Sequence, residues 1–378
     1  MESSVRVPAY ELPLPAPGVR HKRVGLIWEF LVCEKLTQEN KGRQLHSVVS
    51  IETRALDNFD RLSRSLERRS RRETVPIFGA KIERAMTQAQ TVPPSPAARL
   101  KALLERDTIL IMPGCHDAMS ARLIEAAGFE IGFMSGFAVS ADRLGMPDTG
   151  LISYAELADQ GQNICRAVSI PLIGDGDTGF GSAQNIKRTV QGYAHAGFAA
   201  IMLEDQIAPK RCGHTEGKSV VGRDEALTRV RAAVDARNAG TEILIMARTD
   251  ARAILGLDEA IARCQAFRAL GADITFLEAP VSEEEMRRYC VEVDGPKMAN
   301  LIEGGKTPLL SPSRLQQIGY SIAVYPLTLL NVSIAAMRSA LESLKRGETP
   351  ASLMNFDELK QAVGFPEYYA EEARYRSL

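Results

Sequence analysis

The sequence predicts an α/β protein with the fold of a (β/α)8 TIM barrel. Three observations favour this class. Eight short apolar segments alternate with helical patterns, the alternating region spans about 240 residues, and most of the apolar segments end in a polar residue. A doubly wound open sheet would have fewer strands and a glycine fingerprint after its first strand, and the sequence has neither feature.

The chain has 378 residues and is 45% hydrophobic, which suits one large domain with an appendage. We divide it into a basic N-terminal extension (1–90), the catalytic barrel (91–346) and a C-terminal helical tail (347–378). The extension carries 16 Lys and Arg against 11 Asp and Glu. Three interpretations of it stay open: a transit peptide, a segment upstream of a true start at Met86, or a poorly ordered extension.

Composition excludes several classes of function. The formal net charge is −1, so no overall field attracts nucleic acid, and no apolar run is long enough to span a membrane. Six cysteines occur without CxxC pairs, which is typical of reduced thiols. We therefore expect a soluble intracellular protein, either cytoplasmic or in an organelle matrix if the extension is a transit peptide.

The strands are predicted from short apolar runs, and the helices from apolar residues at helical spacing that often follow a capping serine. The predicted strands are 109–112, 131–134, 171–174, 200–203, 243–247, 274–277, 297–299 and 322–324. The predicted barrel helices are 118–127, 153–168, 182–197, 223–240, 257–270, 283–293, 312–318 and 328–346, after a short helix at 97–105.

The segment Gly174–Gly181 reads GDGDTGFG and directly follows a predicted buried strand. Asp175 and Asp177 lie two residues apart, and the surrounding glycines leave room for a ligand to approach. Paired carboxylates in such a place suit a hard divalent cation such as Mg²⁺. An Asp-Gly turn with solvated acids is the alternative.

Polar side chains end six of the eight predicted strands, where the active sites of such barrels lie. Glu204 follows the neighbouring strand, so it can share one Mg²⁺ with the two aspartates. Arg248 can bind a carboxylate through two hydrogen bonds or can form an ion pair with Glu278. The six strand ends are Ser135-Gly136, Asp175 with Asp177, Glu204-Asp205, Arg248 to Asp250, Glu278 and Asn300.

The loop after the fourth strand carries a cysteine among cationic residues. Cys212 is flanked by Lys210, Arg211 and His214, a setting that we expect to lower the pKa of the thiol and make it a usable proton donor or nucleophile. Gly213 and Gly217 suggest that the loop moves as a lid over the substrate. An ordinary basic surface loop is the alternative, and zinc is disfavoured because no second ligand pair follows.

From about residue 97 to 346 the sequence resembles the isocitrate lyase and phosphoenolpyruvate mutase superfamily. The matching motifs are Ser135-Gly136, Leu144 to Asp148, the GDGDTGFG segment, Leu203 to Gln206, Lys210 to His214, Ala247 to Ala251, Glu278 to Pro280 and Asn300. The resemblance implies a (β/α)8 barrel whose last helix is swapped between subunits, in a homotetramer.

The resemblance also implies roles for individual residues. Mg²⁺, or Mn²⁺ in its place, would lie near Asp175, with Asp177 and Glu204 in contact through water and Asp148 close by. Cys212 would be the catalytic acid, aided by Lys210, His214 and Arg248. The small carboxylic-acid substrate would be bound by Ser135, Gly136, Phe137, Gly213, Arg248, Glu278 and Asn300.

The reaction implied is a retro-Claisen cleavage of a substituted malate or of 2-methylisocitrate. Members that cleave carbon–carbon bonds carry the Lys-Arg-Cys-Gly-His loop, which disfavours the first alternative, a phosphonate mutase. Oxaloacetate hydrolysis is the second alternative, and a non-catalytic binding protein would be expected to have lost Cys212 or some of the acids. The segment Leu301–Pro308 and the residue Phe137 depart from methylisocitrate lyases and leave the substrate open.

Overall fold

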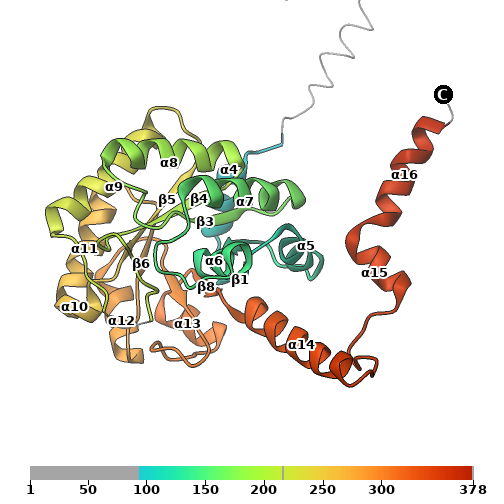
Figure 1. The fold of residues 1–378 in the computed structure, drawn as a ribbon. Helices are drawn as coiled ribbons and strands as arrows, with labels where there is room; N and C mark the ends of the chain where they lie inside the picture. The colour runs from blue at the N-terminus through green and yellow to red at the C-terminus, as the bar shows by residue number, and fades with distance from the viewer. Residues whose placement is uncertain (1–92, 215–216, 377–378) are drawn as a thin grey trace, which may run out of the picture. The chain divides into compact units, whose positions relative to one another are not determined.

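A computed structural model describes residues 93–214 and 217–376. Eight parallel strands form a nearly closed barrel in the order β6-β5-β4-β3-β2-β1-β8-β7, and a bridge between Thr275 and Lys297 joins the two ends of this order. This confirms the predicted barrel (Figure 1). The strands are β1 (Leu110–Cys115), β2 (Gly132–Met134), β3 (Leu172–Asp175), β4 (Ala200–Glu204), β5 (Leu244–Thr249), β6 (Ile274–Leu277), β7 (Met298–Asn300) and β8 (Ile322–Tyr325).

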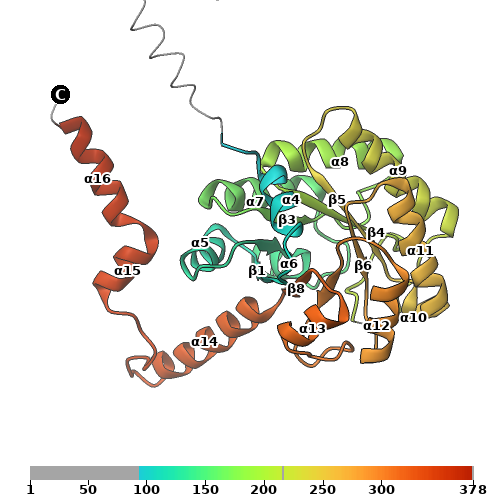
Figure 2. The same ribbon diagram turned by 180° about the vertical axis from the view of Figure 1, so that it is seen from behind.

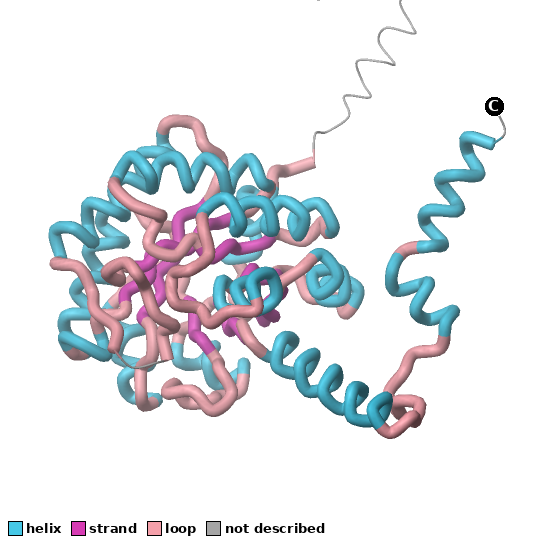
Figure 3. The backbone as a smooth tube through the Cα atoms, in the orientation of Figure 1, coloured by secondary structure: helices cyan, strands magenta, loops and turns pink. Residues whose placement is uncertain are grey.

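Helices surround the strands, as Figure 3 shows by colour. The helices that match predicted ones are α4 (Pro96–Leu104), α5 (Ala118–Ala126), α7 (Tyr154–Ala167), α8 (Ala183–Ala196), α9 (Arg223–Asn238), α11 (Leu257–Leu270), α12 (Glu283–Glu292), α13 (Pro312–Ile318) and α14 (Thr328–Lys345). Two helices were not predicted, α6 (Gly136–Leu144) and α10 (Arg252–Leu255). The helix α6 matters for function because it begins directly after β2, at the mouth of the barrel.

Capping residues fix where the helices begin. Ser153 and Glu156 form a reciprocal capping box at α7, and Ser282 accepts a hydrogen bond from the backbone N–H of Glu285 at α12. Ser135 caps α6 in the same way, by accepting from the N–H of Ala138. The side chain of Ser135, at the end of β2, therefore serves as the N-cap of α6.

The apolar core has separate layers inside and outside the barrel. Side chains such as Met112, Ile173, Met202 and Phe276 fill the interior, and a larger cluster lies between the strands and their helices. Because strands alternate their side chains between these two apolar layers, the charged groups of the barrel gather at the strand ends. One end of the barrel can therefore hold a charged site.

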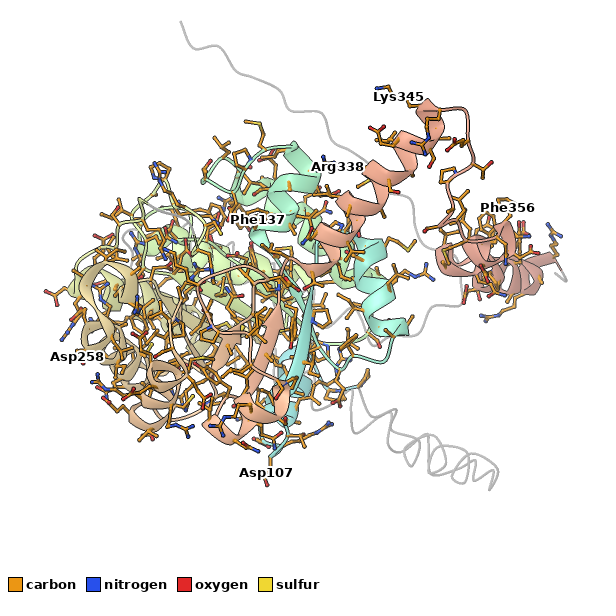
Figure 4. All side chains as sticks on the ribbon, turned by 90° about the horizontal axis from the view of Figure 1, so that it is seen from below. Asp107, Phe137, Asp258, Arg338, Lys345 and Phe356 are labelled. Carbon is orange, nitrogen blue, oxygen red and sulfur yellow. The ribbon has the colours of Figure 1, made fainter. Side chains whose placement is uncertain are left out.

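The eighth barrel helix, α14, extends away from β8 (Figures 1 and 2). Its apolar residues are exposed in one chain: Leu341 is 63% exposed and Met337 57%. Figure 4 labels Arg338 and Lys345 along this helix and Phe356 at the start of the next. Two further helices, α15 (Phe356–Val363) and α16 (Phe365–Arg376), occupy the predicted tail.

An apolar groove lies beside β1, β8 and α5. Its volume is about 380 Å³, and it is lined by residues that include Ile111, Leu123, Phe129, Tyr325 and Leu329. Between residues 93 and 376, apart from the two left undescribed, no helix is long and apolar enough to cross a membrane. The three interpretations of residues 1–90 concern a segment that lies outside the described residues.

Candidate active site

The carboxyl ends of the strands enclose a small cavity of about 40 Å³. It is lined by eleven of the predicted site residues: Ser135, Phe137, Asp148, Asp175, Lys210, Cys212, Gly213, His214, Arg248, Glu278 and Asn300. The other three, Gly136, Asp177 and Glu204, do not form part of its wall, although Asp177 and Glu204 are buried beside it. The strand ends therefore meet as predicted, but two of the predicted metal ligands lie behind the surface.

Part of the cavity wall is apolar. Phe137 comes from α6, Ile302 from the segment after β7, and Leu327 from the segment after β8. These three side chains stand outside the strands. The polar lining residues are divided between strand ends, such as Asp175 and Asn300, and loops, such as the cysteine loop. A bound acid would thus meet both charged and apolar groups.

The two aspartates after β3 are placed by backbone hydrogen bonds. Asp175 accepts from the backbone N–H of Asp177 at 3.0 Å and from that of Gly136 at 3.2 Å. A Cβ on Gly136 would lie 2.7 Å from the Asp175 carboxylate, so the close approach of α6 to this acid requires glycine. Asp177 has a positive φ of 48°, a conformation that aspartate tolerates better than most residues.

Lys210 joins two acids that come from different loops. Its Nζ lies 2.6 Å from Asp148 Oδ1 and 2.8 Å from Asp177 Oδ1, and all three side chains are 5% exposed. Burial alone would lower the pKa of Lys210, but Asp177, Asp175 and Asp148 together raise it well above its ordinary value. Lys210 therefore stays protonated and connects the cysteine loop to the acids. Its direct contacts are with these two carboxylates and not with the thiol of Cys212.

Arg248 is surrounded by carboxylates. Its Nε lies 2.9 Å from Asp250 and 3.3 Å from Glu204, and its Nη2 lies 3.1 Å from Glu278. The alternative role considered for Arg248, an ion pair with Glu278 at the barrel mouth, is thus present in the structure. The guanidinium also lines the cavity, so the same side chain can meet a substrate carboxylate.

Glu278 connects β6 with the cysteine loop and with β7. His214 Nε2 lies 3.0 Å from Glu278 Oε1, and Asn300 Nδ2 donates to the Glu278 carboxylate at 3.2 Å. Burial alone would raise the pKa of Glu278, but Arg248 and His214 lower it to about 2. His214 Nδ1 also accepts from the backbone N–H of Lys306, which fixes the imidazole between two loops.

The expected effect on the pKa of Cys212 was wrong in direction. Burial is the largest influence and, with repulsion from Asp148 and Glu278, it raises the pKa above the ordinary value despite the nearby cations. The nearby cations do not offset the burial, since Lys210 is held by two acids and Arg248 by three. A thiol that stays protonated at neutral pH suits a proton donor better than a nucleophile.

Asp205 lies behind the site. Its carboxylate accepts from Thr249 Oγ1 at 2.6 Å and from the Asp250 N–H at 2.9 Å, and it pairs with Arg263 of α11 at 2.9 Å. Asp205 therefore orients its neighbours and does not act merely as a cap of its own strand, the role that its position at the strand end had favoured.

Three functional neighbours were missed in the sequence. Asp250 was noted only as part of a strand end, and no role was predicted for Lys218 or Arg263. The Arg-Thr-Asp sequence could have indicated Asp250, since residues two apart on a strand share a face. Nothing in a helical run marks Arg263 as a fully buried partner of Asp205.

A divalent cation fits the charge of this site. In the described part of the chain, seven buried carboxylates belong to this site and its surroundings, and the buried lysine and arginine side chains paired with them are four (Lys210, Lys218, Arg248 and Arg263). Burial, partly offset by Lys210, raises the pKa of Asp177 to about 6, and burial also raises that of Glu204. Glu204 Oε1 is buried without a hydrogen-bond partner.

The side chains of Asp175, Asp177 and Glu204 are not arranged to coordinate one metal ion directly. No group of three or more His, Cys, Asp or Glu side chains in residues 93–214 and 217–376 is arranged to hold a metal ion. Asp175 alone among the three predicted ligands lines the cavity. The residues therefore fit an ion held by Asp175 and by water, and do not fit a cage of three carboxylates.

Fold and site together define the class of protein: an enzyme built on a (β/α)8 barrel, with an acid-rich pocket under a cysteine loop. The family model for phosphoenolpyruvate phosphomutase matches residues 100–345. The chain therefore belongs to the phosphoenolpyruvate phosphomutase family, which confirms the resemblance seen in its motifs.

Among curated proteins, the chain is 41% identical over 283 residues to a 2,3-dimethylmalate lyase of Eubacterium barkeri; the match covers 74% of this chain and 98% of that protein. It is 38% identical to a 2-methylisocitrate lyase of Aeropyrum pernix, covering 74% of this chain and 90% of the relative.

Solved structures agree with these relatives. An oxaloacetate acetylhydrolase in complex with 3,3-difluorooxalacetate has a TM-score of 0.72 at 34% identity, covering 74% of this chain and 97% of its own. A phosphonopyruvate hydrolase in complex with oxalate and Mg²⁺ has a TM-score of 0.67 at 28% identity, covering 75% of this chain and 99% of its own.

Proposed function

We propose that this enzyme is a Mg²⁺-dependent carbon–carbon lyase that cleaves a substituted malate or a 2-methylisocitrate-type acid into a 2-oxo acid and a second carboxylate. The relatives named above include two lyases of the same superfamily, which supports the reaction class. The observation that carries the proposal is that Asp175, Arg248 and Cys212 line one cavity from three different loops and strands.

The substrate would lie with one carboxylate at Arg248 and Asn300, since these groups line the cavity at the ends of β5 and β7. Ser135 and the N-terminus of α6 would bind the acid on the side of Asp175. A magnesium ion near Asp175 would, when bound, polarise the oxygen at C2 and neutralise the adjacent carboxylate.

Cleavage would break the bond between C2 and C3 after the C2 hydroxyl passes its proton to one of the buried carboxylates beside the cavity, Asp177 or Glu204, which later releases it to solvent. The electron pair of that bond would leave with C3, as a carbanion stabilised by its own carboxylate. Cys212 would then donate its proton to C3, which completes the second product. The raised pKa of the thiol keeps that proton in place until the carbanion forms.

Two other reactions fit parts of the site. Oxaloacetate hydrolysis is favoured by the structural similarity to an oxaloacetate acetylhydrolase. A phosphonate mutase is favoured by the family match, but the Lys-Arg-Cys-Gly-His loop weighs against it.

One experiment separates these reactions. Purified protein with Mg²⁺ would be assayed for product formation from 2,3-dimethylmalate, 2-methylisocitrate, citramalate, oxaloacetate and phosphonopyruvate, with and without a chelator. We expect cleavage of one of the first three, abolished by the chelator. Turnover of phosphonopyruvate alone, or activity that survives chelation, would contradict the proposal.

We also propose that α14 of a second copy fills the apolar groove beside β1 and β8, in a homotetramer. Supporting this, the exposed apolar face of α14 and the empty groove lie on the same chain, next to the same strand. Light scattering would give the mass in solution. A monomer at micromolar concentration would rule the exchange out.

A further inference from the structure

Lys218 lies at the end of the cysteine loop and connects two parts of the site. Its Nζ lies 2.8 Å from Asp250 Oδ1 and also donates to the backbone carbonyl of Gly213, the residue after Cys212. The Lys218 side chain is 2% exposed and that of Asp250 is fully buried. The proposed function uses neither residue.

Asp250 also pairs with Arg248, which lines the cavity of the proposed active site. Its two carboxylate oxygens accept from Arg248, from Nε at 2.9 Å and from Nη2 at 3.2 Å. Asp250 is itself fixed at the backbone, where its N–H donates to Asp205. A rigid carboxylate therefore connects the arginine that would bind substrate with the lysine that holds the loop.

The cavity is too small for the proposed substrate while the loop lies over it. Its volume of about 40 Å³ is far below the roughly 300 Å³ at which small-molecule pockets begin. Residues 210–214 supply part of its wall, so opening of this loop is the direct way to admit a larger substrate. The bonds that hold the loop in its closed position are therefore part of the catalytic cycle.

We propose that Lys218 is a positioning residue that fixes the closed cysteine loop, by joining the Gly213 carbonyl to the Asp250–Arg248 pair. This inference rests on the proposed role of Cys212 as proton donor. The thiol of Cys212 is one residue from the carbonyl that Lys218 holds. Closing the loop and placing Arg248 for a substrate carboxylate thus depend on the same carboxylate, Asp250.

Lys218 and His214 hold the loop at different points. His214 contacts Glu278 and the backbone of Lys306 on the β6 and β7 side, whereas Lys218 acts on the β5 side. Removing the Lys218 ammonium would free the Gly213 carbonyl without leaving Asp250 unpaired, because Arg248 still donates to it twice. The fold should tolerate this change, since the buried acid keeps a cation.

The test is the rate at which iodoacetamide alkylates Cys212 in the full-length protein with Mg²⁺, followed by mass spectrometry of the Cys212 peptide. A hydrogen bond to a charged group contributes about 1.5–3 kcal/mol, so Lys218→Met should raise the alkylation rate roughly ten- to a hundredfold. A purely electrostatic role predicts the opposite sign, because losing a cation makes the thiol less acidic. An unchanged or slower rate would overturn the proposal.

Two further variants sharpen the result. Lys187→Met removes an exposed lysine on α8 and should leave the rate at the wild-type value. Lys218→Gln keeps an N–H donor for the Gly213 carbonyl, so its rate should fall between wild type and Lys218→Met. If Lys218→Met fails to fold, the Gln variant decides, and a wild-type rate in that variant would overturn the proposal.

Alkylation requires no substrate, so this test does not depend on the proposed reaction. Where a substrate is turned over, Lys218→Met should lower kcat at least about tenfold and leave KM within about threefold, because the loop closes after binding. If kcat/KM falls because KM rises while kcat stays unchanged, the result would contradict a role of Lys218 in loop closure. If the protein has no lyase activity but Lys218→Met still raises the alkylation rate of Cys212, the proposed function is refuted and the role of Lys218 in holding the loop stands.

Discussion

Lys210 Nζ lies 2.8 Å from Asp177 Oδ1, and this contact joins the loop after β4 to the loop after β3. Both side chains are 5% exposed. The pair brings the cysteine loop, which would donate the proton, against the acids that would sit near the metal. Charge neutralisation and loop placement are thus achieved by one ammonium group.

Replacing Lys210 by methionine should destabilise the protein strongly. The change leaves Asp148 and Asp177 buried without their cation, and removing one partner of a buried pair costs about 3–5 kcal/mol. Urea unfolding would measure the loss, with Lys187→Met as the exposed control. A loss no larger than that of the control would show that these acids are already protonated or hydrated.

Gly136→Ala should weaken Mg²⁺ binding. The new Cβ would lie 2.7 Å from Oδ2 of Asp175, so the proposed metal-binding carboxylate has to move. Isothermal titration with MgCl₂ would detect a decrease in affinity of about tenfold or more, since one kcal/mol or two is enough for such a change. Gly222→Ala is the matched control, because a Cβ there meets nothing within 4 Å. Equal affinities in the two variants would place the ion away from Asp175.

Cys212→Ser should remove turnover and leave metal binding intact. A serine hydroxyl is a much weaker acid than a thiol, and losing a general acid typically costs about 10²- to 10⁴-fold in rate. The measurement is kcat on the cleaved substrate beside Mg²⁺ titration of the same protein. Cys165→Ser, on α7, serves as control, and full activity of Cys212→Ser would remove the acid role.

The alkylation of Cys212 should depend steeply on pH. Burial raises the pKa of the thiol above the ordinary 9.0, so the reactive thiolate is scarce at neutral pH and increases as the pH passes 9. The rate with iodoacetamide should therefore keep rising above pH 9 without reaching a plateau there. A plateau near pH 7 would mean that the cations of the loop do lower the pKa.

Glu278 should make the protein sensitive to acid. Its pKa of about 2 in the folded protein is below the ordinary 4.5, so its ion pairs stabilise the fold at every pH above 4.5. That stabilisation is lost as the pH falls from 4.5 toward 2. Urea unfolding over this range should show the loss in wild type and a smaller one in Glu278→Gln; parallel curves would contradict the assigned pKa.

The sequence was sufficient for the barrel because each strand is a short apolar run that ends in a polar group. All eight strands were predicted to within three residues at either end, for example Ile274–Leu277 without error. The helix α6 was missed because Ser135-Gly136 was interpreted only as a strand end that binds substrate. The same serine is also a helix cap, which local sequence could have indicated.

The sequence was sufficient to predict which residues form the site, but not how their charges and pKa values are set. Asp175, Arg248 and Glu278 follow strands, so their meeting follows from the fold. The pKa of Cys212 depends on how deeply the loop is buried and on which acids already hold Lys210, and both are properties of the folded chain. Lys218 and Arg263 were missed for the same reason, because their partners lie 32 and 58 residues away along the chain.

The division of the cavity wall has a consequence for how this enzyme could be modified. Phe137, Ile302 and Leu327 are apolar wall residues that stand outside the strands, whereas the reacting groups stand on the strand ends and on the cysteine loop. Substitutions at these three positions can reshape the space around the alkyl part of an acid without disturbing the charged network. A laboratory selection for new substrates would therefore do best to randomise these three positions and leave the strand ends fixed.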